Sequence, residues 1–144
     1  MVSRRFGDAS RDASDASPVL VVDEDLDAAA GTLAALAPDG YHGVAESDGD
    51  AALRYVRGAH VRLVVSELYV KCGEGPCVVT VLKGDRQRLP RLRVLVYTHH
   101  EGEVDVEWAL ATGCDGLVFK SAAPGVLVRE VARLDGAPYP PSIN

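Results

Sequence analysis

Five short apolar runs, separated by longer segments with helical periodicity, constrain the fold of this chain more than any other feature. The runs are residues 19–22, 41–45, 61–66, 92–97 and 117–119. Continuous runs of aliphatic and β-branched residues are typical of strands that are covered on both faces. The pattern therefore predicts a central sheet with helices packed against both of its faces.

The segments between the runs carry apolar residues at helical spacing. The predicted helices are residues 26–37, 51–57, 77–86, 104–111 and 124–134. In the first helix, the residues spaced to face the sheet are Leu26, Ala30, Leu33 and Ala37. Strands that alternate with helices through short junctions predict an α/β domain with a doubly wound, five-stranded parallel sheet.

The five strand–helix units predict one domain over residues 18–136. Residues 1–17 are rich in Ser, Asp, Ala and Arg without apolar periodicity, which predicts a flexible N-terminal tail. The Pro-rich residues 137–144 predict a short C-terminal tail. Because only this tail follows the last helix, we expect a stand-alone domain.

Charge and composition exclude several classes of function. The net charge of −6 and the pI near 5.1 argue against a nucleic-acid partner, because phosphate contacts need clustered Lys and Arg. No apolar run approaches the roughly 18 to 20 residues of a membrane span, and no signal peptide is evident, so a cytoplasmic location without membrane contact is expected. Three cysteines without CxxC spacing predict free thiols.

Polar residues follow four of the predicted strands at the point where each strand ends. They are Asp23 with Glu24, then Glu67, Thr98 and Lys120. The carboxyl ends of parallel strands meet at one edge of a sheet, where ligands bind in open α/β folds. These residues therefore form the candidate site.

In this order, the strand-end residues resemble those of a response-regulator receiver domain, the phosphorylatable module of bacterial two-component signalling. The resemblance covers about residues 18–134 and implies a flavodoxin-like (βα)5 fold with strand order 2-1-3-4-5. It implies that Asp23 and Glu24 match the acidic pair that holds Mg²⁺. Thr98 would match the hydroxyl that contacts the phosphoryl group, and Lys120 the lysine that pairs with it.

Three positions depart from the pattern of the family. Glu67 stands at the phosphoacceptor aspartate, Leu117 at the switch aromatic, and Ser121 where proline is common after the lysine. The extra methylene of glutamate displaces the carboxylate by roughly 1.5 Å, which disfavours in-line attack on a metal-bound phosphoryl donor. We therefore expect that Glu67 is not phosphorylated. Its carboxylate either mimics the phosphoryl group in an active-like state or only pairs with Lys120 as a structural relic.

The excess of carboxylates at the predicted site requires compensation. Asp23, Glu24 and Glu67 with one lysine leave about two excess negative charges, which a bound Mg²⁺ or a shared proton would offset. Zinc is disfavoured, because its candidate ligands Cys72 and Cys77 have loose spacing and are supported only by His99 and His100 in another loop.

A partner surface is indicated by apolar residues off the predicted buried faces. They are Trp108 in the fourth helix and Val126 and Val128 in the fifth, although Trp108 also suits a core position. The resemblance implies partner binding or homodimerisation through the fourth helix, fifth strand and fifth helix.

The favoured function is signalling by protein–protein interaction with a kinase, an output protein or a second copy. The alternatives are a module gated by a metal ion or small molecule, an ordinary phosphorylatable regulator and, last, a metal-assisted enzyme using Asp23 and Glu67.

Overall fold

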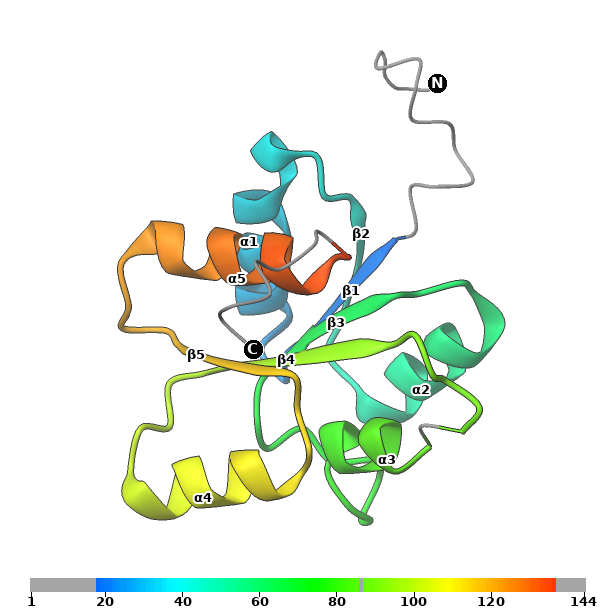
Figure 1. Ribbon diagram of the computed structural model, residues 1–144. Helices are drawn as coiled ribbons and strands as arrows, with labels where there is room; N and C mark the ends of the chain where they lie inside the picture. Colours follow the sequence, from blue (N-terminus) through cyan, green and yellow to red (C-terminus); the bar gives the residue numbers. More distant parts are fainter. Residues whose placement is uncertain (1–17, 86, 137–144) are drawn as a thin grey trace.

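The computed structural model describes residues 18–85 and 87–136, so the two predicted tails lie outside the described residues. Five parallel strands form one sheet in the order β2-β1-β3-β4-β5, which confirms the predicted topology (Figure 1). The strands are β1 (Val19–Val22), β2 (Gly43–Glu46), β3 (Leu63–Ser66), β4 (Arg93–Thr98) and β5 (Gly116–Phe119). The helices are α1 (Leu26–Leu36), α2 (Gly49–Gly58), α3 (Val78–Gly84), α4 (Glu103–Ala111) and α5 (Pro124–Leu134), with a 3-10 turn η2 (Ala37–Asp39) after α1.

The sheet is the middle of three layers. Helices α1 and α5 cover one face, while α2, α3 and α4 cover the other (Figure 1). Successive side chains of a strand point to opposite faces. In β1, Leu20 and Val22 therefore join the core under α2 and α3, and Val19 and Val21 join the core under α1 and α5. This two-sided burial explains why the strands are continuous apolar runs.

The buried face of α1 differs from the predicted one. Ala29 and Leu36 are fully buried, whereas Leu26 is 51% exposed and Ala30 and Ala37 are also exposed. Alanine occurs on every side of this helix, so apolar spacing does not select one face. The predicted set was wrong except for Leu33, which is partly buried against the core.

Two further details of the helices differ from the predictions. Helix α3 begins at Val78 and ends at Gly84, two residues before the predicted end, consistent with the low helix propensity of glycine. Val126 and Val128 of α5 are partly buried against the core rather than exposed. They lie about 100° to either side of the buried Leu127 and so flank the buried face of the helix.

Within residues 18–85 and 87–136, no helix has the length and apolar character needed to cross a membrane.

Candidate functional site

Four predicted residues meet at the carboxyl edge of the sheet: Asp23 after β1, Glu67 after β3, Thr98 at the end of β4 and Lys120 after β5. The parallel register explains why they meet. Val22 pairs with Ser66, so the residues that follow, Asp23 and Glu67, leave adjacent strands at the same level. The backbone N–H of Lys120 donates to the carbonyl of Thr98 at 2.8 Å, which extends this alignment to β5.

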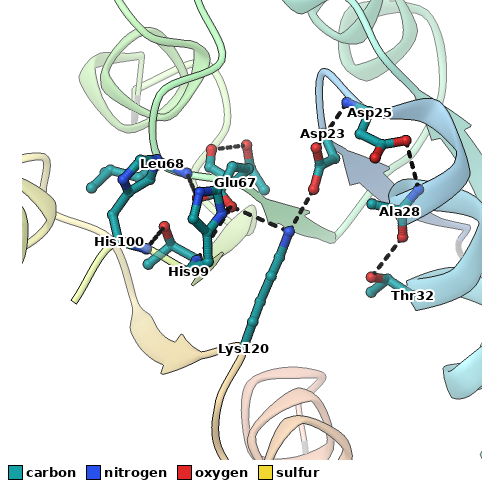
Figure 2. Close-up of polar contacts among 11 residues, drawn as sticks. Asp23, Asp25, Ala28, Thr32, Glu67, Leu68, His99, His100 and Lys120 are labelled. Carbon is teal, nitrogen blue, oxygen red and sulfur yellow. Dashed lines mark hydrogen bonds and ion pairs between the residues drawn. The ribbon is translucent and has the colours of Figure 1, made fainter.

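The ammonium of Lys120 bridges the two buried carboxylates (Figure 2). Its Nζ lies 2.6 Å from Asp23 Oδ2 and 3.2 Å from Glu67 Oε2. Burial by itself lowers the pKa of Lys120, but the hydrogen bonds to Asp23 and Glu67 outweigh it and raise the pKa above its ordinary value. Lys120 is therefore held charged between two carboxylates.

Glu67 is the most heavily bonded residue of the site. Its Oε1 accepts a hydrogen bond of 2.8 Å from the backbone N–H of Leu68, and its Oε2 lies 3.0 Å from His99 Nδ1. Burial raises the pKa of Glu67, but hydrogen bonds from Thr98, Leu68 and Lys120 together lower it below its ordinary value. Glu67 is thus ionised in the folded protein, which argues against the predicted alternative of a shared proton on this residue.

The Thr98 side chain is fully buried beside Glu67. Its Oγ1 accepts a hydrogen bond of 3.0 Å from the backbone N–H of His100, and the polar Thr98 side chain helps to lower the pKa of Glu67. Both residues predicted to contact a phosphoryl group, Thr98 and Lys120, are therefore engaged with Glu67 itself.

The acidic pair is divided between the interior and the surface. Asp23 is 8% exposed and its Oδ1 accepts from the backbone N–H of Asp25 at 2.9 Å, whereas Glu24 is exposed. Carboxylate oxygens of Asp23, Glu24 and Glu67 fit the donor preference of Mg²⁺. The Lys120 ammonium already lies between Asp23 and Glu67, so a Mg²⁺ ion held there would compete with it.

Two histidines not assigned to the strand-end site lie beside Glu67 (Figure 2). Within the part of the chain that the structure describes, Glu67, His99 and His100 are the one group of three or more potential metal ligands, with their donor atoms within 4.8 Å of one another. Cys72 and Cys77, which were considered as zinc ligands and disfavoured, are not part of this group. Burial also raises the pKa of both the Cys72 and Cys77 thiols, which disfavours the thiolate form that binds metals.

The sequence separated Glu67 from His99 by 32 positions and gave no local signal for their contact. Only the pairing of β3 with β4, in which Ser66 lies opposite Val96, brings the two residues together.

The predicted partner residues lie apart from one another. Trp108 is 44% exposed and lines a hollow between α3 and α4, so it is neither a core residue nor directed toward α5. Helix α4 also exposes Val104 by 75% and Leu110 by 63%. Leu117, at the position of the switch aromatic, is partly buried against the core on the α2–α4 face.

Comparisons with known proteins agree with this geometry. The model of the response regulator receiver domain family matches residues 19–132. A LuxR-family two-component response regulator from Aurantimonas sp. is 29% identical, with a TM-score of 0.70 over 83% of this chain and 86% of that chain. The receiver domain of a signal transduction histidine kinase from Syntrophus aciditrophicus is 25% identical, with a TM-score of 0.71 over 83% and 89%.

A CheY-like receiver domain protein from Methanospirillum hungatei shares the fold, at 18% identity and a TM-score of 0.68 over 83% of this chain and 94% of that chain. A comparison with proteins of curated function finds no match. Receiver domains are modules of two-component signalling that interact with kinases and output domains, commonly bind Mg²⁺ and are generally not enzymes. Because the family model matches residues 19–132 and the order of the strands agrees with it, this chain belongs to the response regulator receiver domain family.

Proposed function

We propose that this chain is an atypical receiver domain that signals by binding a partner protein and is not phosphorylated at Glu67. The observation that carries the proposal is the engagement of Glu67 by both phosphoryl-contact positions. Lys120 Nζ lies 3.2 Å from its Oε2, and the neighbouring Thr98 side chain helps to lower the pKa of its carboxyl group. The carboxylate thus makes the contacts that a phosphoryl group on a shorter side chain would make.

Chemistry at Glu67 supports the same proposal. A phosphoacceptor must present a free carboxylate oxygen to the phosphorus atom in line with the leaving group. In Glu67, Oε1 is bonded to the Leu68 N–H, and Oε2 faces Lys120 and His99. Attack by Oε2 would disturb its contacts with both Lys120 and His99.

The mimic and the relic interpretations predict different behaviour for one variant. In the mimic, replacing Glu67 with glutamine weakens the contact to Lys120 and lowers partner affinity, because the active-like arrangement depends on the charge. In the relic, Glu67→Gln lowers stability without a separate effect on binding. We favour the mimic, because Lys120 pairs with the carboxylate and Thr98 as well as Lys120 lowers its pKa.

The partner is proposed to be a protein bound through α4, either a kinase, an output protein or a second copy of this chain. Val104, Trp108 and Leu110 expose apolar surface on this one helix, and such a patch marks a contact site. Replacing Val104 or Leu110 with aspartate should abolish binding, while the exposed Ala35→Asp change on the opposite side of the sheet should not.

The experiment that tests the proposal is intact mass measurement after incubation with acetyl phosphate and Mg²⁺. The wild type should gain no phosphoryl group. The Glu67→Asp variant should gain one, because it restores the shorter carboxylate beside Thr98 and Lys120. The double variant Glu67→Asp, Lys120→Ala is the control and should gain less. Phosphorylation of the wild type at Glu67 would refute the proposal and make the chain an ordinary switch.

A further inference from the structure

We propose that Glu67, His99 and His100 form a binding site for a divalent transition-metal ion of the zinc class. The site lies beside the Lys120 contact and adds to Glu67 two donors, the His99 and His100 rings, that the strand-end pattern does not assign. It goes beyond the proposed function, which places no ion at these histidines.

The separations of the donor atoms fit a shared ion. His99 Nδ1 and Glu67 Oε2 are 3.0 Å apart. Two ligands bound at about 2.0 to 2.1 Å from one ion are separated by about 2.9 Å in octahedral and about 3.4 Å in tetrahedral geometry. All three donor atoms lie within 4.8 Å of one another, so at that upper limit a ligand pair must close by about 1.4 Å to reach the tetrahedral separation.

The three residues are held with different degrees of freedom, which suits a site that closes around an ion. The Glu67 side chain is only 8% exposed and is anchored by the Leu68 N–H, whereas the His99 side chain is 66% exposed and can move. His100 is partly buried, and its ring packs edge-on against Tyr69 at a centroid distance of 4.8 Å. The centroids of the His99 and His100 rings lie 4.1 Å apart.

The local backbone explains why two consecutive histidines point to one place. In a regular strand, neighbouring side chains point to opposite faces. Strand β4 ends at Thr98, and the chain bends at His99 while the N–H of His100 donates to Thr98 Oγ1 at 3.0 Å. The bend brings both rings beside Glu67 (Figure 2).

Charge and donor type select the class of ion. Asp23, Glu67 and Lys120 together carry a net charge of −1, and the 2.6 Å bond of Lys120 to Asp23 neutralises part of its repulsion on a cation. Imidazole nitrogens with one carboxylate suit Zn²⁺, Co²⁺, Ni²⁺ or Cu²⁺, whereas Mg²⁺ prefers oxygen donors throughout. A fourth position remains for water, as in other sites with two histidines and one glutamate.

The test is a titration of the metal-free full chain with Co²⁺, followed by visible absorption, and then Zn²⁺ competition against a chromophoric chelator. We expect one equivalent to bind, with a ligand-field spectrum of nitrogen and oxygen donors, and no displacement by excess Mg²⁺. The variants His99→Ala and His100→Ala should each weaken binding by about tenfold or more, because each removes a direct ligand.

The matched control is His60→Ala, which removes an exposed histidine after α2 and should leave the affinity unchanged. The variant Cys72→Ser, Cys77→Ser tests the alternative zinc ligands and should also bind as the wild type does. Far-UV circular dichroism verifies that each variant is folded. Equal affinity in the His99→Ala, His100→Ala and wild-type chains would overturn the proposal, as would loss of binding in the cysteine variant alone.

Discussion

The bridge made by Lys120 gives the sharpest quantitative prediction. In Lys120→Met, the ammonium that lies 2.6 Å from Asp23 and 3.2 Å from Glu67 is lost, while both carboxylates stay buried. At an effective dielectric of 20, the two attractions are about 6 and 5 kcal/mol before desolvation is subtracted. Removing one partner of a buried ion pair costs about 3 to 5 kcal/mol in net terms. The Lys120 side chain is 24% exposed, so we expect about 3 kcal/mol.

The stability lost in Lys120→Met should depend on Glu67. In a Glu67→Gln background, Lys120→Met leaves only one buried carboxylate unpaired, so its cost should fall by about 1 to 2 kcal/mol. Urea unfolding of the wild type, both single variants and the double variant measures this coupling. Lys71→Met, at an exposed lysine, is the control and should change stability by less than about 0.5 kcal/mol. Additive effects of the two substitutions would refute the idea that Lys120 stabilises the site through Glu67.

Other consequences of the structure are open to direct measurement. The pKa of Glu67 is lowered on folding, so its contribution to stability is present above its unfolded pKa and is lost as the pH falls through its folded pKa. The stability of Glu67→Gln should therefore fall less steeply with acid than that of the wild type. The raised pKa of Lys120 gives the opposite sign, with stability present below the unfolded pKa and lost as the pH rises through the folded value in alkali. Gly43→Ala should lower the free energy of unfolding in urea by about 2 kcal/mol or more, because its Cβ would lie 1.7 Å from a β1 carbonyl oxygen. Gly31→Ala, in open space on α1, should raise the same free energy by about 0.5 to 1 kcal/mol. Tyr69→Phe removes a 2.6 Å hydrogen bond to an α4 carboxylate, so it should lower the free energy of unfolding by about 1.5 to 3 kcal/mol. The hydrogen bond raises the pKa of Tyr69 to about 12, so a spectrophotometric titration of the variant should lack this late-titrating tyrosine.

The strand-end residues could be predicted from the sequence because two local rules act together. A run buried on both faces must be apolar, so the first polar residue after it marks the edge of the sheet. In a parallel sheet, all such edges coincide. Asp23, Glu67, Thr98 and Lys120 therefore lie together at the edge that the pattern of apolar runs indicated.

Helix orientation was less predictable. A helix rich in alanine, such as α1, has no single apolar face, and only packing against the sheet selected Ala29 and Leu36 over Leu26 and Ala30. The direction of Trp108 toward α3 rather than α5 likewise depends on how α4 is rotated against the sheet.

The amino-acid sequence by itself determined the alternation of strands and helices, and with it the residues at the carboxyl edge. Tertiary structure decided which of those side chains contact one another. Lys120 lies between Asp23 and Glu67, and the His99 ring contacts the Glu67 carboxylate. The physical reason is that burial patterns are local, repeating every two or three to four residues. Contacts among these side chains are set by strand register and chain bends that join positions 32 to 97 residues apart.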